Sequence, residues 1–292
     1  MSLFSDFKSS TKGVPVDEFV DLVLYRPLSF IVVKLVQTLP VKPNQLSFIA
    51  MTSGIASGVY FSQGTRIGFF LGGLLCFLAN VFDCSDGMLA RLKSCGTLTG
   101  RIVDGAVGHV MMLSIYTGLG IGLVRAGNAG LVDLPLPPLL LAGLAAFGHF
   151  VKATLADYFA CQYAAHVLGG DCIPQLEYEF FSREMSRLRE EGTWSWDRVI
   201  IGLYLAYTKF QLGPRPKPFI RYEPEEYKRL NRLLVMLWNF AGPSMHLFML
   251  FISAMFFRPM IFLFYAVFVS SVWVLILVPI QAAVNRRMKE TS

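Results

Sequence analysis

Long apolar stretches alternate with shorter polar ones through most of the chain. Each stretch is about 20 residues long, the length that an α-helix needs to cross the hydrocarbon core of a bilayer. The pattern predicts an all-α, polytopic membrane protein, with about six transmembrane helices in a single domain over residues 1–292. The expected spans are residues 45–62, 67–82, 100–124, 139–166, 230–257 and 260–284.

Two segments depart from this pattern. Residues 14–39 mix charged and apolar positions, which predicts an amphipathic N-terminal helix, or two helices joined at Pro27, lying on the membrane surface. Residues 170–228 form a polar insertion between the fourth and fifth spans. Within it we expect amphipathic helices over 182–191 and from Ser195, interfacial anchors at Trp194 and Trp196, and a stiff linker over 213–218.

Composition narrows the class of protein further. The chain is 54% hydrophobic, and its mean hydropathy of +0.52 excludes an ordinary soluble domain. A net charge of +6 would suit nucleic acid or an anionic membrane, and the apolar runs favour the membrane over nucleic acid. The five cysteines form no C-x-x-C pair, so neither a disulfide framework nor a zinc site is expected. No cleaved signal peptide is expected at the polar N-terminus.

The basic residues predict an orientation in the membrane. Arg66, Arg125 and Arg258 are the only basic residues in the loops on one side, whereas many more fall on the other side. Because cytoplasmic loops carry an excess of lysine and arginine, both termini and the stretch around residues 83–91 are expected on the cytoplasmic face.

Three aspartates stand out against the apolar background. Asp83 and Asp86 are three residues apart and share a face of a helix, and Asp104 begins the next apolar segment. Acidic side chains at a membrane are costly unless something compensates their charge. Because carboxylate oxygens hold hard cations such as Mg²⁺, three that converge across a helix hairpin indicate a divalent metal site.

The neighbours of these aspartates fit a phosphate ligand. Gly87 and Ala90 lie on the same helical face and leave room for a bulky group. Arg91 adds a fixed positive charge suited to phosphate. Together they predict a phosphate-ester site at the membrane surface.

The stretch resembles the signature of the CDP-alcohol phosphatidyltransferase family, D-x2-D-G-x2-A-R-x8-G-x3-D-x3-D. The resemblance implies a transferase of phospholipid synthesis that moves a phosphatidyl or phospho-alcohol group from a CDP-linked alcohol to an acceptor hydroxyl and releases CMP. CDP-diacylglycerol is the favoured donor, and the family implies a homodimer. The matching positions are Asp83, Asp86, Gly87, Ala90, Arg91, Gly100 and Asp104.

The same resemblance implies roles for these residues. The three aspartates would hold one or two Mg²⁺ or Mn²⁺ ions that grip the CDP diphosphate. Gly87, Ala90, Arg91 and Gly100 would line the nucleotide pocket, with Arg91 also acting on the reacting phosphate. Asn44 and Ser47 match the family's P-N-x-x-[ST] and would join that pocket, although helix capping by Asn44 explains its position equally well.

The chain departs from the signature at one place. The last aspartate, proposed as the family's general base, is replaced by Gly108. His109 is a candidate base, although on a helix it points about 100° away from position 108 and a packing role is an alternative. His149, a metal-bound hydroxide, or no base at all are further alternatives, and the last would make the chain a pseudoenzyme that binds metal and CDP-lipid. The stripe of Gly100, Asp104 and Gly108 could also serve close helix packing.

The fourth span carries further ionisable residues. His149 and Lys152 share a helical face, and Asp157 follows toward the cytoplasmic end. Because ionisable residues inside a span are functional candidates, we expect these three to bind the acceptor alcohol. Lys152 could instead extend to the interface or pair with Asp157. A transporter is disfavoured because the sequence shows no inverted repeat.

Overall fold

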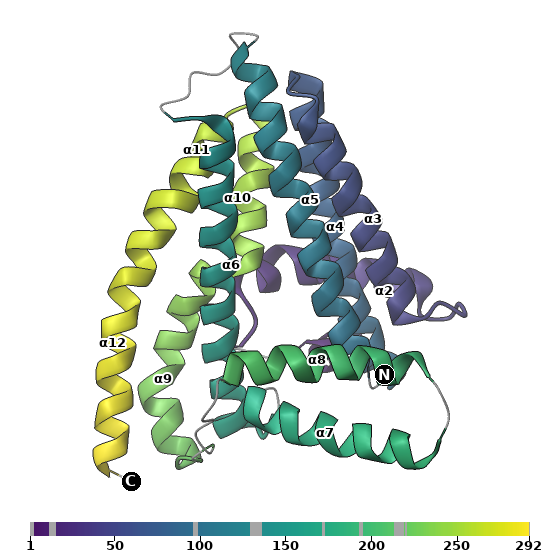
Figure 1. Cartoon of the computed structure of the whole chain (residues 1–292), viewed down its shortest axis with the longest axis vertical. Coiled ribbons are helices and arrows are strands. Elements are labelled where there is room, and N and C mark those ends of the chain that lie inside the picture. Colours follow the sequence, from purple (N-terminus) through teal and green to yellow (C-terminus); the bar gives the residue numbers. More distant parts are fainter. Residues whose placement is uncertain are drawn as a thin grey trace.

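The protein is a bundle of long helices, and two helices, α7 and α8, lie across one end of it (Figure 1). The computed structural model describes residues 3–11, 16–95, 99–128, 136–170, 173–192, 195–212, 219 and 221–291, and these contain helices and no strands. Five helical stretches in this part of the chain are long and apolar enough to cross a membrane, which confirms an all-α polytopic membrane protein. They are Arg66–Lys93, Ile102–Asn128, Pro138–Leu168, Pro224–Met255 and Pro259–Met288.

The first three long helices pack tightly together. They are α3 (Pro43–Ser62), α4 (Arg66–Lys93) and α5 (Gly100–Asn128), and α3 contacts both of the others. The backbones of α3 and α5 touch, since a methyl group on Gly118 would lie 1.9 Å from the carbonyl oxygen of Gly58. Although α3 has 20 residues, it is not among the five apolar stretches, so the sixth span stays a prediction.

The second half of the bundle is more irregular. The fourth expected span is α6 (Pro138–Tyr163), continued by a π-helical turn to Leu168. The expected span over 230–257 is a pair of helices, α9 (Pro224–Trp238) and α10 (Pro243–Met255), rather than one.

The break between α9 and α10 has a physical cause at its centre. Pro243 begins α10 and has no N–H with which to continue a helix from α9. The carboxylate of Glu18 accepts hydrogen bonds from the backbone N–H groups of Ser244 and Met245 at 3.4 and 3.2 Å. A side chain more than 200 residues away in sequence therefore satisfies the donors that the break exposes.

The last expected span is one continuous helical run that contains a π-helical turn. It comprises α11 (Pro259–Phe264), a π-helical turn (Tyr265–Val269) and α12 (Ser270–Thr291), and Pro279 lies inside α12. The expected span was residues 260–284, and α12 continues one to two turns beyond its C-terminal limit.

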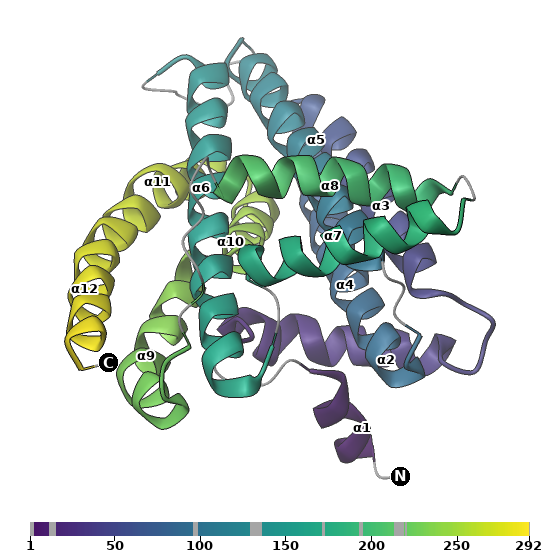
Figure 2. The same ribbon diagram turned by 60° about the horizontal axis from the view of Figure 1, so that its bottom comes forward.

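The N-terminal segment runs across the spans (Figures 1 and 2). It contains α1 (Leu3–Ser10), a π-helical turn (Asp21–Tyr25) and α2 (Arg26–Val36). Tyr25 and Val33 are buried against the bundle, whereas an apolar stripe on the other side is exposed. The segment is therefore helical and amphipathic, and its position at the membrane surface stays a prediction. The exposed stripe consists of Phe19, Val23, Ile31 and Leu35.

The polar insertion forms a helical hairpin that also crosses the spans (Figure 2). Its helices are α7 (Pro174–Glu190), which begins eight residues before the expected limit, and α8 (Trp196–Leu212). Ser195 precedes α8 as expected, and its hydroxyl accepts a hydrogen bond from the N–H of Arg198. Trp194 and the expected linker over 213–218 lie outside the described residues.

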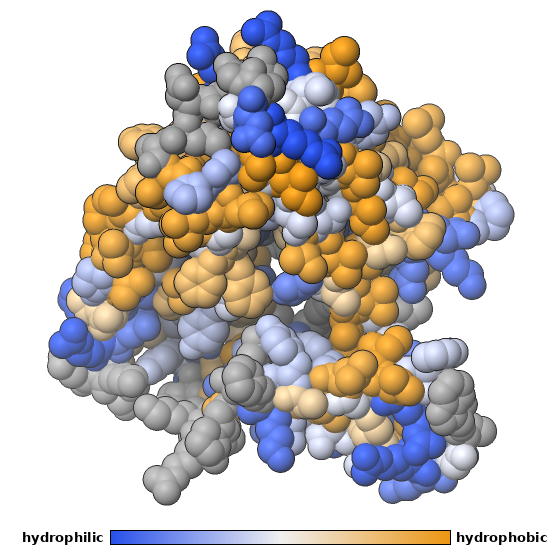
Figure 3. Space-filling view, turned by 45° about the horizontal axis from the view of Figure 1, so that its top comes forward, coloured by the Kyte–Doolittle hydropathy of each residue, from blue (hydrophilic) through white to orange (hydrophobic). Residues whose placement is uncertain are grey.

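Polar residues gather at the two ends of the bundle, and apolar residues form a broad band between them (Figure 3). At one end Arg125 donates to the carbonyl of Ser62 at 2.7 Å, and Arg66 lies 5.5 Å from the ring of Phe257. The helix ends that carry Arg66 and Arg125 therefore lie at one end of the bundle, while α7 and α8 lie toward the other (Figure 1).

Candidate metal and phosphate site

The three aspartates singled out by the sequence converge. Asp83 and Asp86 lie near the C-terminal end of α4, and Asp104 lies near the start of α5. One carboxylate oxygen from each residue lies within 4.8 Å of the other two. Asp86 is buried, and the other two are partly buried. The helix hairpin thus assembles the trio that the spacing predicted.

The donor set fits a hard divalent cation. Three ionised carboxylates so close together repel one another, and a bound cation would remove that repulsion. Carboxylate oxygens at partly buried positions are the ligands that Mg²⁺ and similar ions prefer. This group can therefore hold a divalent metal ion.

The hydroxyl of Ser47 holds one of these carboxylates in place. Ser47 lies in the first turns of α3, is buried, and donates a short hydrogen bond to Oδ2 of Asp86. The sequence placed Ser47 in the nucleotide pocket and missed this contact, although P-N-x-x-S does put the hydroxyl one turn inside the helix. Ser47 therefore orients a carboxylate of the trio.

Asn44 occupies a different position from the one expected of a cap. Helix α3 begins at Pro43, after Lys42, whose N–H donates to the side chain of Gln45 at 2.9 Å. Asn44 thus lies inside the first turn and is exposed. The capping explanation is wrong, and a role in nucleotide binding stays a prediction.

Arg91 is tied to the N-terminal segment. Its Nε donates to the carbonyl oxygen of Ser10 at 2.6 Å, and its terminal nitrogens lie over Gly87, 3.4 and 3.5 Å from where a Cβ would be. Gly87 and Ala90 are both partly buried. A guanidinium has five N–H donors, so this bond leaves several available for a phosphate.

Gly108, the last residue of the Gly100–Asp104–Gly108 stripe on α5, faces empty space. A Cβ on Gly108 would meet no atom within 4 Å, whereas Gly118 and Gly122 of the same helix touch the backbone of α3. The alternative that Gly108 serves close helix packing is therefore wrong. Gly100 begins α5, and the space beside Gly108 lies one turn beyond Asp104.

His109 is turned toward α6. Its Nδ1 lies 2.6 Å from the carbonyl oxygen of Gly105, and its ring lies 5.8 Å from that of Phe150, edge to face. The side chain is exposed. These contacts give His109 a packing partner, and its role as a base stays a prediction.

A second polar group lies deep between α6, α10 and α12. Lys152 is buried and donates to the carbonyl of Ala266 and to the hydroxyl of Ser270, the latter at 2.7 Å. That hydroxyl lies 3.4 Å from Nε2 of His246, whose ring is 4.8 Å from the ring of His149. We call these four side chains, Lys152, His149, His246 and Ser270, the buried polar cluster.

Of the three residues expected to bind the acceptor alcohol, only two lie together. His149 and Lys152 share the buried polar cluster, whereas Asp157 is exposed on α6. Lys152 neither extends to the interface nor pairs with Asp157, so both alternatives are wrong. The sequence missed His246, although an ionisable residue in an apolar run is a signal that could have found it.

The insertion packs on the start of α5. The hydroxyl of Thr99 donates to Oδ1 of Asp197 in α8 at 2.8 Å. Ile102 packs against a cluster formed by Phe181, Met185 and Ile201 of α7 and α8. The helical hairpin thus holds the turn of α5 that leads to Asp104.

Comparison with known proteins agrees with this site. No curated protein matches the chain. A family model does match, over residues 40–162, which include α3, α4, α5 and nearly all of α6. The matched segment contains the whole aspartate trio, and it confirms the resemblance that the motif indicated. The model that matches residues 40–162 is that of the CDP-alcohol phosphatidyltransferases, and this similarity supports phosphatidyl transfer from a CDP-alcohol at a membrane.

Proposed function

We propose that the protein transfers a phosphatidyl group from CDP-diacylglycerol to the hydroxyl of a small polar alcohol and releases CMP. The carrying observation is the convergence of Asp83, Asp86 and Asp104 within 4.8 Å, one turn from the open space at Gly108. Mg²⁺ or Mn²⁺ is the proposed cofactor. When bound, the ion would neutralise phosphate charge and stabilise the departing CMP.

The chain's own residues divide the work of holding the donor. The three aspartates hold the cation, and Ser47 keeps the Asp86 carboxylate in one orientation. Arg91 offers its remaining N–H groups to a phosphate while Ser10 fixes its position. Positioning and charge stabilisation supply most of the catalysis in phosphoryl transfer, so rigid placement matters more than any single reactive group.

The remaining pocket residues take supporting roles. Gly87, Ala90 and Gly100 have no side chain beyond a methyl group, so the nucleotide can approach the backbone of α4 and α5. Asn44 is exposed at the start of α3, where its amide can reach a base or a ribose.

The acceptor must lose a proton, and position 108 supplies no base. His109 takes that role in this proposal once its ring turns away from Phe150. On α6, His149 and Lys152 offer polar groups to the acceptor from the buried polar cluster, and Asp157 lies between one and two turns beyond Lys152 toward the helix end.

The proposal places the site on the cytoplasmic face. Arg66 and Arg125 mark the end that has few basic residues, whereas the aspartate trio lies at the opposite end with Arg91 and Lys93. Lys93 donates to the carbonyls of Leu39 and Val41 there. The positive-inside rule favours the cytoplasm for that end, where CDP-linked substrates are made.

A product assay tests this function. Purified protein with CDP-diacylglycerol, mixed alcohols and Mg²⁺ or Mn²⁺ should release CMP and form a new phospholipid visible by mass spectrometry. Asp86→Asn should lower kcat on the order of 1,000-fold, because it removes a cation ligand and the partner of Ser47. The matched control, Glu190→Gln on the exposed end of α7, should leave the rate unchanged. Equal rates in all three proteins would refute the proposal.

A second candidate function follows from Gly108 alone. A protein that keeps the trio but lacks the base would bind metal and CDP-lipid without turnover. Calorimetric binding of CDP-diacylglycerol with Mn²⁺ and no CMP release in the parent would favour this pseudoenzyme, whereas rapid parental turnover would exclude it.

A further inference from the structure

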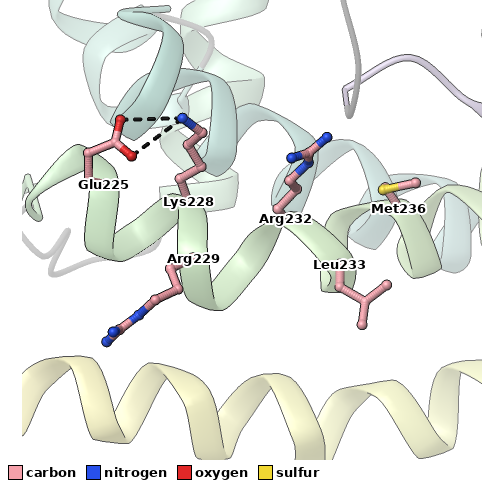
Figure 4. A pocket seen from close by; sticks show the side chains of 6 residues that line it. All are labelled: Glu225, Lys228, Arg229, Arg232, Leu233 and Met236. Carbon is pink, nitrogen blue, oxygen red and sulfur yellow. Dashed lines mark hydrogen bonds and ion pairs between the residues drawn. The ribbon is translucent and has the colours of Figure 1, made fainter.

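A shallow groove runs along one face of α9, far in sequence from the aspartate trio. Its volume is about 440 Å³, within the range of small-ligand pockets. The helix packs against α6 on one side and α12 on the other, and Figure 4 shows Arg229 and Leu233 pointing toward α12. The lining residues are Glu225, Lys228, Arg229, Arg232, Leu233 and Met236.

The charge at the start of the groove is positive. Glu225 and Lys228 form an ion pair at 3.3 Å, as Figure 4 shows, and they neutralise each other. Arg229 and Arg232 are exposed, and neither has a carboxylate partner among the described residues. Both arginines line the groove, and Figure 4 shows Arg229 pointing toward α12 and Arg232 pointing away from it. Because their side chains are long and exposed, both guanidinium groups can turn toward one anion that lies between them.

The other end of the groove is apolar. Leu233 and Met236 are 66% and 41% exposed, so neither belongs to the packed core. They follow the arginines along a stretch, Pro224–Met255, that is apolar enough to cross a membrane. The order along the helix, cations first and apolar side chains next, matches the order of phosphate and acyl chain in a phospholipid.

Buried side chains fix the position of α9, the helix that carries the groove. Trp238 stacks on Phe159 of α6, with ring centroids 4.6 Å apart, and donates to the side chain of Gln281 in α12 at 3.2 Å. Gln281 also donates to Asn231 at 2.8 Å. These contacts hold α9 between its two neighbours, so a ligand can bind without movement of the helix backbones.

We propose that this groove binds an anionic phospholipid of the surrounding bilayer. Its phosphate lies between Arg229 and Arg232, and one acyl chain lies along Leu233 and Met236. Residues 224–236 fall outside the segment that matches the family model, so this site does not depend on the proposed transfer reaction.

Native mass spectrometry of the full chain tests the proposal. Protein released from phosphatidylglycerol or phosphatidylcholine nanodiscs should retain the anionic lipid preferentially. Because a basic side chain near an anionic surface is worth about 1 kcal/mol, the Arg229→Gln/Arg232→Gln double variant should bind phosphatidylglycerol roughly 30-fold more weakly. The matched control removes two exposed arginines of α7, Arg183→Gln/Arg189→Gln, and should bind as the parent does.

Two further arms separate a lipid from a free phosphate. Leu233→Asn should weaken phosphatidylglycerol binding several-fold, because it removes apolar contact at an exposed position without touching the core. Millimolar inorganic phosphate should not displace the lipid. Displacement by phosphate, equal retention of the two lipids, or equal loss in both double variants would each overturn the proposal.

Discussion

The α3–α5 half of the bundle and the α6–α12 half are held together by different kinds of contact. In the first, backbones touch: methyl groups on Gly118 and Gly122 would lie 1.9 Å from carbonyl oxygens of α3. In the second, helices are joined by side chains, such as the Phe159–Trp238 stack and the bond from Lys152 to Ser270. Backbone contact permits one geometry, whereas side chains can change with substitution.

This difference matches the distribution of chemistry. The trio of carboxylates lies on the closely packed half, where a fixed spacing of 4.8 Å or less can be kept without adjustment. The family model ends at residue 162, before α9, α10 and α12, which carry the rest of the buried polar cluster and the groove. We therefore expect donor chemistry to depend on the first half and acceptor choice on the second.

The largest expected effect tests the packing side of this comparison. Gly118→Ala should lower the free energy of unfolding by roughly 3 kcal/mol, because neither backbone can move away from the added methyl group. Gly143→Ala on α6, where an added Cβ meets nothing within 4 Å, should change it by less than about 0.5 kcal/mol. Circular dichroism during denaturation in micelles measures both. Equal destabilisation would show that the two halves are packed alike.

The next effect tests whether position 108, in the first half, lacks a catalytic side chain. Gly108→Asp should raise kcat for CMP release on the order of 100-fold, because a carboxylate one turn from Asp104 can take the acceptor's proton. The side chain has room, so folding should be unaffected.

Gly108→Asn is the control for this change, because it adds the same volume without a base. Steady-state CMP release from CDP-diacylglycerol compares the three proteins. Equal activation by asparagine, or a fall with aspartate, would contradict the assignment of position 108.

Much of the first half was predictable from the sequence. The spacing of Asp83, Asp86 and Asp104 placed all three carboxylates together, because helical period and a short hairpin suffice to define that geometry. The first residue of α5 was also predicted correctly, and so, outside this half, was the position of Ser195 before α8. These are local properties that hydropathy, turns and caps determine.

What could not be predicted depends on contacts between distant segments. The division of the fifth span relies on Glu18, whose carboxylate reaches the start of α10. Arg91 meets the carbonyl of Ser10, and Lys152 meets Ser270, across 81 and 118 residues of sequence. No local pattern in one sequence marks such pairs, so the tertiary fold had to supply them.

The smallest expected effect tests the acceptor side of the comparison. Lys152→Met should raise the KM for the acceptor alcohol about tenfold while the KM for CDP-diacylglycerol stays constant. Methionine is similar to lysine in length but has no charged hydrogen-bond donor. The apolar cluster in which Leu155 and Phe159 of α6 pack with Val274 and Leu277 of α12 is unchanged, so the helices stay joined. Thr154→Val, at an exposed position on the same helix, is the control and should change neither constant. A rise in both KM values together would show that Lys152 supports the fold of the whole site, and the division between donor and acceptor halves would then be wrong.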